Sequence, residues 1–434
     1  MTNKLSNQFK TYIQKKMERY VVQYFKAHPE VKLVVVAGSV GKTSTKLAIA
    51  TVLSQRLRVR MHEGNHNASL SAPLAILGID YPGNIKSLGA WLSVFRAAKA
   101  RIAQPADVDV IIQELGTDRI GEIPYFGNYL RPDIGIITAV SPEHMEFFRT
   151  IEAVAQEELA AANFSVRALI NRDDIDGSYA KYLTNANVNT YGTSGAAEYR
   201  FIDEDFSLET GHRGKLVVSE WQDPIDTHIK ALGEHSLRPA IAAAAVAVKL
   251  GLNATEIAAG LSKVHAAPGR MNVLRGINGA IIIDDTYNSS PLAGACALRA
   301  LYTLSVPQRI AVLGSMNELG DSSAVEHQAL GILCDPSQLA WVVTVGDEAE
   351  KYLAPAARAQ GCQVKICKTA LEAGGFVHGV LEPGAAVLFK GSQGGIFLEE
   401  AVKVVLHSTD DERHLVRQSA AWLEQKNAFF SKFS

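Results

Sequence analysis

The sequence predicts an α/β protein with two main domains: a P-loop central domain built on a doubly wound parallel sheet, and a smaller, Rossmann-like C-terminal α/β domain. Three observations lead to this prediction. From Val31 onward, apolar β-branched stretches alternate with segments of helical spacing, the pattern of a parallel sheet covered by helices. A glycine-bearing turn, residues 38–41, joins the first strand to a helix. The alternation stops near Pro268 and then restarts, which indicates a second domain.

The length and composition of the chain are those of a multidomain globular protein. Its 434 residues are more than one hydrophobic core usually serves. A content of 47% hydrophobic and 20% charged residues is typical of globular proteins. The formal charge of −2 gives no general attraction to nucleic acid or anionic membranes, so we expect no nucleic-acid partner, and a nucleic-acid motor is poorly supported. No stretch reaches the ~18 apolar residues of a membrane span. Scattered cysteines and the absence of an apolar signal sequence favour a cytoplasmic location.

Residues 4–27 are predicted to form one charged amphipathic helix, because large apolar residues recur at helical spacing and His28-Pro29 ends the pattern. We expect this helix to pack on the domain behind it. A basic helix on a membrane surface is a weaker alternative, because Glu18 and several tyrosines interrupt the pattern.

The first strand and its turn predict a phosphate site. The run Val34–Ala37 is followed by Gly38-Ser39-Val40-Gly41-Lys42-Thr43-Ser44 and then by a helix. Glycines allow a tight turn whose N–H groups point inward, the helix N-terminus favours an anion, Lys42 reaches phosphates and Thr43 can ligate Mg²⁺. The loop is shorter than the full G-x-x-x-x-G-K-[ST] pattern, because Val36 stands five positions before Gly41. A chance Gly-Lys-Thr in a strand–helix turn is the alternative.

Three further predicted strands end in polar residues. The stretch 108–115 ends at Glu114, the stretch 133–140 precedes His144, and the stretch 167–171 precedes Asp173-Asp174. Ligands of doubly wound sheets bind beyond the carboxyl ends of the strands, so these side chains are candidates for one site. Taken singly, Glu114 could also be a solvated cap at a strand end, and His144 a hydrogen-bonded turn histidine.

The remaining chain predicts the following domain organisation. Short strand-like pieces at 199–206, 215–221 and 228–232 predict a small antiparallel insertion, and strands at 279–284, 309–314, 341–346 and 385–389 build the second domain. The expected parts are an N-terminal helix (1–30), a central domain (31–267) with the insertion at about 190–232, a C-terminal domain (268–410) and a helical tail (411–434) that packs on the core or on another subunit.

The chain resembles the Mur ligase family from about residue 33 to 405. The motifs that carry the resemblance are Gly-Ser-Val-Gly-Lys-Thr-Ser (38–44), Gly64-Asn65-His66-Asn67, Glu114-Leu115-Gly116, His144-Met145-Glu146, Gly269-Arg270, Asp284-Asp285-Thr286-Tyr287-Asn288, Glu318-Leu319-Gly320, His327 and Lys390-Gly391-Ser392. Each motif is weak alone, but the ordered set is specific. The Asp-Asp-Thr-Tyr-Asn and Lys-Gly-Ser motifs point to the branch that adds D-alanyl-D-alanine in peptidoglycan synthesis.

The resemblance implies an ATP- and Mg²⁺-dependent amide ligase. ATP would phosphorylate a substrate carboxylate, and an amine would attack the resulting acyl phosphate. The implied catalytic residues are Lys42, Glu114, His144 and Glu158. The implied metal ligands are Thr43, Glu114, His144 and Glu158. The implied nucleotide-binding residues are Gly38, Ser39, Val40, Gly41, Lys42, Thr43, Ser44, Asn65, Asn67, Arg270, Asp285, Asn288 and His327, and the implied substrate-binding residues are Lys390, Ser392 and Gln393.

Several positions depart from the family pattern. Glu158 stands where the family usually has a carbamylated lysine, and we expect its carboxylate to replace the carbamate as a metal ligand. Residues 233–239 lack the two asparagines usual near the adenine, and Gln393 stands where this branch has arginine. About 30 residues precede the first strand, too few for the family's uridine-nucleotide-binding first domain.

These departures leave the substrates open. A UDP-linked muramoyl peptide and D-Ala-D-Ala are the first expectation, with a partner protein or self-association replacing the first domain. A different carboxylate and amine pair, such as a poly-amino acid or a cofactor side chain, is the alternative within enzymes. A nucleotide-binding partner without ligase activity is a third possibility.

Overall fold

The computed structural model describes residues 2–62, 67–85 and 87–433. These residues divide into two compact units. Unit 1 contains the chain up to Val140, then Thr150–Ile229 and Leu237–Val264. Unit 2 contains Ser141–Arg149, Lys230–Ser236 and the chain from His265 onward. Each unit is built on one sheet. Because the segments of the two units alternate along the sequence, the chain passes between the units several times.

Unit 1 contains a nine-stranded sheet in the order β2-β3-β1-β4-β5-β6-β7-β8-β9. The strands from β2 to β7 run parallel to their neighbours, and β8 and β9 complete the sheet as antiparallel strands. Their bounds are β1 Lys32–Ala37, β2 Val59–Met61, β3 Val110–Glu114, β4 Ile134–Ile137, β5 Arg167–Asn171, β6 Val188–Gly192, β7 Tyr199–Ser207, β8 Gly211–Val217 and β9 Ile225–Ile229.

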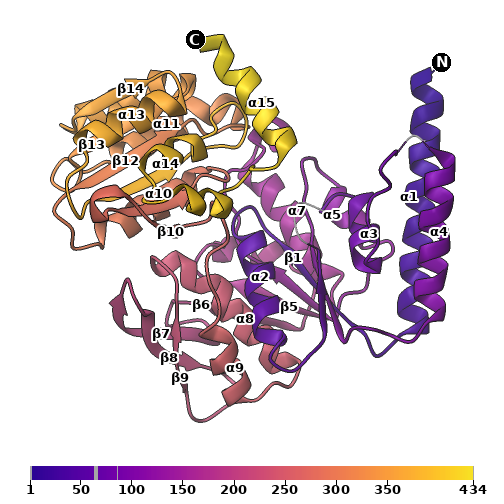
Figure 1. Cartoon of the computed structure of the whole chain (residues 1–434). Coiled ribbons are helices and arrows are strands. Elements are labelled where there is room, and N and C mark those ends of the chain that lie inside the picture. The colour runs from indigo at the N-terminus through magenta and orange to yellow at the C-terminus, as the bar shows by residue number, and fades with distance from the viewer. Residues whose placement is uncertain (1, 63–66, 86, 434) are drawn as a thin grey trace. The chain divides into compact units, whose positions relative to one another are not determined.

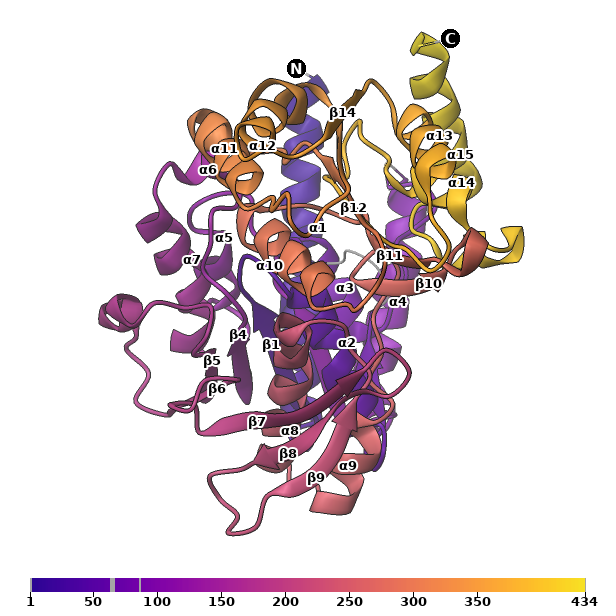
Figure 2. The same cartoon turned by 90° about the vertical axis from the view of Figure 1, so that its left-hand side faces the viewer.

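The segment predicted as a small antiparallel insertion contains strands β7, β8 and β9. These strands are antiparallel to one another and continue the main sheet (Figure 2). The connection is β6, which pairs in parallel with both β5 and β7. Only two residue pairs join β6 to β7, so this short contact gave no recognisable sequence pattern.

The helices of unit 1 include the predicted N-terminal helix. That helix is observed over Thr2–Ala27, and its chain turns at His28 as expected. Helices α2, α8 and α9 pack together, while α4 packs against α1 (Figure 1). The bounds are α1 Thr2–Ala27, α2 Lys42–Leu53, α3 Ser71–Leu77, α4 Leu88–Ala103, α5 Glu122–Phe126, α7 Ile151–Asn163, α8 Arg238–Lys249 and α9 Ala254–Leu261.

Unit 2 contains a six-stranded sheet in the order β10-β11-β15-β12-β13-β14, in which β10 alone is antiparallel. Its strands are β10 Asn272–Arg275, β11 Ile281–Asp285, β12 Arg309–Gly314, β13 Trp341–Val345, β14 Val364–Cys367 and β15 Ala386–Lys390. Its helices are α6 Met145–Phe148, α10 Pro291–Tyr302, α11 Ser323–Ile332, α12 Ala354–Ala359, α13 Ala370–Val380, α14 Glu399–Val405 and α15 Ala420–Phe430.

The C-terminal tail packs on unit 2, the first of the two expected arrangements. The ring of Phe429 on α15 lies 5.3 Å from that of Phe397. Lys426 is 2% exposed, and its Nζ lies 2.9 Å from Glu399 Oε1 and 2.7 Å from Glu400 Oε1 on α14. Buried charges are tolerated when they are paired, so these contacts fix the tail in one position.

Over the described residues, no helix combines the length and the apolar character that a membrane-spanning segment requires.

Candidate nucleotide and substrate site

The glycine turn between β1 and α2 has the geometry of a phosphate loop. Gly38 and Gly41 have φ of 125° and 88°, values that favour glycine, and Gly41 caps the N-terminus of α2. A Cβ at Gly38 would overlap Thr138 Oγ1 and lie 2.8 Å from Ala139 N, so the loop lies directly against the chain after β4. Close approach of bare backbone is what exposes N–H groups to an anion at a helix N-terminus.

Replacing Gly38 with alanine should weaken ADP binding far more than replacing Gly41. Both substitutions strain a positive φ, which costs roughly 1–2 kcal/mol. Only the Gly38→Ala methyl group also meets backbone atoms that have no room to move; at Gly41 the nearest atom is Thr138 Cβ at 3.8 Å. Calorimetric titration of both variants with ADP tests this, and equal losses would contradict the loop geometry.

The structure brings two of the predicted metal ligands, Thr43 and Glu114, together. Thr43 Oγ1 donates to Glu114 Oε2 at 3.1 Å, which links the first turn of α2 to the end of β3. Asn67 Nδ2 lies 3.5 Å from Glu114 Oε1. Asn65, also predicted to contact the nucleotide, falls outside the described residues. A hydroxyl beside a carboxylate at a helix N-terminus is an oxygen donor pair of the kind that Mg²⁺ takes.

Lys46 is a site residue that the sequence analysis missed. Its side chain is buried, and its Nζ lies 3.5 Å from Glu114 Oε2 and 3.1 Å from the carbonyl of His62. Lys42, four residues earlier, donates to the carbonyl of Gly38 and so curls over the loop. The i, i+4 spacing of two lysines on α2 was the available signal.

The remaining loop residues lie between the end of β1 and the first turn of α2. Ser39 and Val40 belong to the turn itself, and Ser44 lies in the first turn of α2.

Glu158 contacts the loop directly. Its Oε2 accepts a hydrogen bond of 2.6 Å from Gly38 N, and the residue is 1% exposed. The adjacent Glu157 accepts from the backbone N–H groups of Gly121 at 2.7 Å and Ile123 at 2.6 Å, while burial raises its pKa. Two consecutive carboxylates of α7 therefore hold two segments: Glu158 holds the phosphate loop, and Glu157 holds the start of α5. The sequence prediction placed Glu158 at a metal; the observed contact is to the backbone of the phosphate loop.

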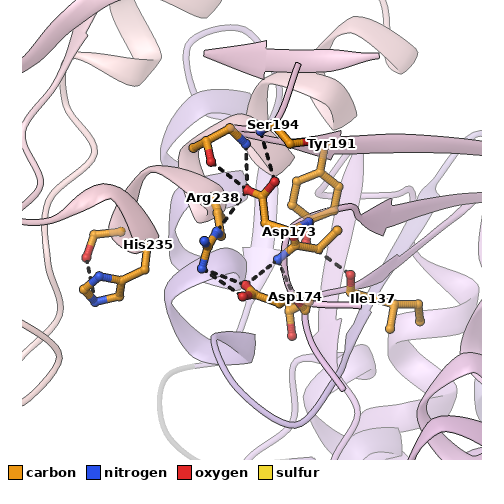
Figure 3. Close-up of polar contacts among 11 residues, drawn as sticks. Ile137, Asp173, Asp174, Tyr191, Ser194, His235 and Arg238 are labelled. Atoms are coloured by element: carbon orange, nitrogen blue, oxygen red, sulfur yellow. Dashed lines mark hydrogen bonds and ion pairs between the residues drawn. The ribbon is translucent and has the colours of Figure 1, made fainter. Parts of the chain in front are cut away.

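The acidic pair after β5 is neutralised by an arginine from α8. Arg238 Nη1 lies 2.9 Å from both oxygens of Asp174, and its Nε lies 3.1 Å from Asp173 Oδ2 (Figure 3). Asp173 also accepts from Thr193 N at 2.7 Å and Ser194 N at 3.0 Å. This network ties β5, β6 and α8 together at the carboxyl edge of the sheet, and its carboxylates are thus already satisfied.

His144 belongs to unit 2, on the segment Ser141–Arg149. Its Nδ1 lies 2.9 Å from Glu318 Oε2, and both residues adopt positive φ, 49° and 65°. The hydrogen bond from His144 lowers the pKa of Glu318. A carboxylate on Nδ1 fixes the orientation of the ring, and His144 Nε2 lies 3.6 Å from Glu143 Oε1. Glu318 belongs to the Glu318-Leu319-Gly320 motif, and the sequence alone predicts no role for its side chain.

The Asp-Asp-Thr-Tyr-Asn loop of unit 2 is an ordered, charged structure. Lys390 Nζ lies 2.6 Å from Asp285 Oδ2 and donates to the carbonyl of Asn288 at 3.0 Å. The guanidinium of Arg270 lies 4.2 Å from the centre of the Tyr287 ring. Four of the predicted residues therefore belong to one cluster, formed around the loop after β11.

Burial raises the pKa of Asp284 to about 6, although Thr286 and the backbone of Gly269 donate hydrogen bonds that favour its charged form.

Three other predicted residues of unit 2 have different surroundings. His327 is fully buried: its Nε2 accepts from Met316 N at 2.8 Å, and its Nδ1 lies 2.8 Å from the carbonyl of Ser323. Burial lowers the pKa of His327, and both ring nitrogens contact backbone atoms of unit 2. Ser392 is also buried and accepts from Asn317 N at 2.9 Å. Gln393 is exposed.

Over residues 2–62, 67–85 and 87–433, no three histidine, cysteine or acidic side chains gather into a group that could hold a metal ion by themselves.

Several known proteins are similar to this chain over most of its length. The UDP-N-acetylmuramoyl-tripeptide–D-alanyl-D-alanine ligase of Bacillus subtilis (strain 168) is 27% identical over 389 residues, covering 87% of this chain and 76% of that protein. The ligase of the same name from Escherichia coli (strain K12) is 25% identical over 321 residues, covering 73% and 65%. The crystal structure of the MurF ligase from Thermotoga maritima in complex with ADP has the same fold, with a TM-score of 0.72 at 23% identity, covering 90% of this chain and 83% of that one.

Two family models match the chain in sequence order. The Mur ligase middle domain matches residues 36–247, which include the glycine loop, Glu114, Glu158 and Arg238. The Mur ligase glutamate ligase domain matches residues 269–393, which include Arg270, Asp285 and Lys390. The chain therefore belongs to the Mur ligase family, whose members are ATP-dependent ligases.

Proposed function

We propose that this chain joins a carboxylate to an amine at the expense of ATP, and that its substrates are a UDP-linked muramoyl tripeptide and D-alanyl-D-alanine. One observation supports the chemistry above all others: Thr43 and Glu114, from neighbouring elements, meet at the mouth of a glycine loop that carries Lys42. The names of the curated relatives support the substrate pair.

The arrangement supports activation of the carboxylate as an acyl phosphate. A carboxylate oxygen and the γ-phosphate repel each other, so cations must hold them in line before a bond can form. The Lys42 ammonium and the loop N–H groups neutralise phosphate charge while ADP leaves. The amine then attacks the acyl carbon, phosphate leaves with the oxygen that was phosphorylated, and an amide remains.

The oxygen donors of Thr43 and Glu114 fit Mg²⁺, which keeps several water and phosphate ligands and needs few from the protein. When bound, the metal would lower the charge on the phosphates. Lys46, whose Nζ lies 3.5 Å from Glu114 Oε2, holds this carboxylate in place.

We further propose that Glu158 supplies the negative charge that a carbamylated lysine supplies in other family members. Glu158→Gln keeps an amide oxygen that can accept from Gly38 N, but it loses the charge. We therefore expect ADP binding within about three-fold of the unmodified protein and turnover reduced by roughly 100-fold, a loss typical of one electrostatic group. Removing bicarbonate should leave turnover unchanged. A Glu158→Gln enzyme with normal turnover would contradict this role.

The substrate assignment is tested by ADP release. Purified protein with ATP and Mg²⁺ should release ADP when UDP-N-acetylmuramoyl-tripeptide and D-alanyl-D-alanine are both present, and either substrate alone serves as the control. If this pair fails while another acid and amine in the same assay stimulate release, the chain is a Mur-type ligase for a different pair. The exposed Gln393 favours testing that alternative, because a neutral amide replaces the arginine that would hold a carboxylate in two hydrogen bonds. If the protein binds ADP but forms no ADP from ATP with any substrate pair, it is a non-catalytic nucleotide-binding protein.

A further inference from the structure

Helices α1 and α4 form a parallel pair in unit 1 (Figure 1). The rings of Tyr20 and Phe95 are 6.1 Å apart midway along the pair, and His28 Nε2, just after α1, lies 3.2 Å from the carbonyl of Ile102 near the end of α4. The two helices therefore start at one end of the pair and finish at the other.

The pair is strongly basic in a chain whose net charge is −2. Helix α1 contains six lysine or arginine residues and one glutamate, and α4 contains three basic residues and no acidic one. Lys15, Arg19 and Lys26 follow helical spacing along one exposed stripe of α1, and Arg96 and Lys99 are exposed on α4. In the part of the chain that the structure describes, none of these five side chains pairs with a carboxylate. We call these five residues the basic helix face.

The structure removes the objection that Glu18 interrupts this face. Glu18 is 8% exposed and points inward, where Tyr125 Oη donates to its Oε1 at 3.0 Å. Tyr20 and Tyr24, which also broke the pattern in the sequence, are buried as well. The outer side of α1 therefore carries positive charge without Glu18, Tyr20 and Tyr24, while Tyr12 remains exposed.

Large apolar side chains lie exposed at the starting end of the same pair. Leu88 and Leu92 are 57% and 45% exposed, and with Arg96 and Lys99 they form one stripe of α4 at i, i+4, i+8 and i+11. Tyr12 on α1 and Ile85 just before α4 are 55% and 58% exposed. Helices that lie on anionic membranes combine these features: lysine and arginine along the exposed face, with leucine and aromatic side chains that enter the headgroup layer.

We propose that the α1–α4 pair docks the protein onto an anionic membrane surface, with the basic helix face against lipid headgroups and Leu88 and Leu92 inserted beside them. A second copy of the same face would be repelled by like charge. The basic side chains would also attract a nucleic acid. Its phosphates, however, would not cover Leu88 and Leu92, which would stay exposed to water. The proposal is independent of the substrates assigned above.

Vesicle sedimentation with the full-length purified protein tests this proposal. We expect binding to vesicles that contain phosphatidylglycerol, little binding to phosphatidylcholine alone, and weaker binding as salt rises. The helix variant combines Lys15→Glu, Arg19→Glu, Arg96→Glu and Lys99→Glu. Each basic residue near such a surface strengthens binding about five-fold, so the variant should bind at least about 100-fold more weakly.

The control variant makes the same change in charge at exposed residues elsewhere, with Lys181→Glu, Arg213→Glu, Arg275→Glu and Arg358→Glu, and it should retain most of the binding. Equal losses in the two variants would mean attraction by net charge alone and would overturn the proposal. So would a lack of binding to anionic vesicles by the unmodified protein.

A second variant separates lipid from nucleic acid at constant charge. Leu88→Ser with Leu92→Ser should weaken vesicle binding by about ten-fold or more, because the transfer of two leucine side chains from water is lost. Binding of a fluorescent oligonucleotide, measured in parallel, should be weak. Oligonucleotide binding tighter than vesicle binding, or vesicle binding that is unchanged in the leucine variant, would contradict a membrane surface as the occupant.

Discussion

Replacing Lys42 with alanine should reduce ATP-dependent amide formation by roughly 100- to 1,000-fold, the loss expected when one fixed charge that stabilises a transition state is removed. The ammonium lies over the glycine loop, within hydrogen-bond reach of the carbonyl of Gly38, and α2 holds its backbone at the first helical position. Without it, the loop N–H groups and the metal alone must offset the charge that develops as ADP departs.

The measurement is ADP release with both substrates, and exposed Lys181→Ala serves as the control for loss of a lysine. Thermal unfolding of both variants should match the unmodified protein, because Lys42 is a partly exposed residue at the first position of α2. A Lys42→Ala protein that consumes ATP at the native rate would rule out this loop as the phosphate site.

Replacing Glu399 with glutamine should destabilise unit 2 by about 3–5 kcal/mol, the cost of leaving buried charges without their partner. Glu399 is fully buried; Arg417 Nη2 lies 2.6 Å from its Oε2, and Lys426 Nζ lies 2.9 Å from its Oε1. Arg417 also donates to the carbonyls of Thr286 at 2.7 Å and Tyr287 at 3.1 Å. One carboxylate thus holds the C-terminal tail and, through Arg417, the loop that carries the predicted nucleotide contacts.

This loss should depend on pH. Burial acts to raise the pKa of Glu399, but the hydrogen bonds and charges of Arg417 and Lys426 outweigh burial, and the pKa is lowered. A carboxylate with a lowered folded-state pKa stabilises the fold above its unfolded value and loses that contribution as pH falls through the folded value. The difference between Glu399→Gln and the unmodified protein in urea unfolding should therefore be largest near neutral pH and shrink in acid.

Glu412→Gln is the matched control, because its carboxylate is 37% exposed and lies 3.7 Å from Lys403 Nζ. Such surface pairs contribute about 0–1 kcal/mol. Equal effects of the two substitutions, or a Glu399→Gln penalty that does not change with pH, would contradict the assigned network.

The sequence predicted the fold class because its evidence is local and repeated. Each main strand is an apolar run that ends in a turn, and the phosphate loop is one contiguous segment, so the ends of β1, β3, β4 and β5 were found within a few residues. Strand β2 was missed because three half-buried residues form no pattern. The link that β6 makes to the antiparallel strands was missed because only two residue pairs join β6 to β7.

The parts of the site that escaped prediction depend on contacts between distant residues. The pairing of Arg238 with Asp173 and Asp174 spans more than sixty positions, and that of Arg417 with the carbonyl of Thr286 spans 131. No spacing rule relates such residues, since only the folded chain brings them together. The inward turn of Glu18 is a similar case: its charge was visible in the sequence, but its direction was not.

The central claim is that ATP activates a carboxylate as an acyl phosphate before the amine attacks. The most direct test is to label the carboxylate of the acid substrate with ¹⁸O and to analyse the products by mass spectrometry. Our account predicts one ¹⁸O atom in each inorganic phosphate released, together with ADP. Unlabelled phosphate, or the release of AMP and pyrophosphate, would contradict it.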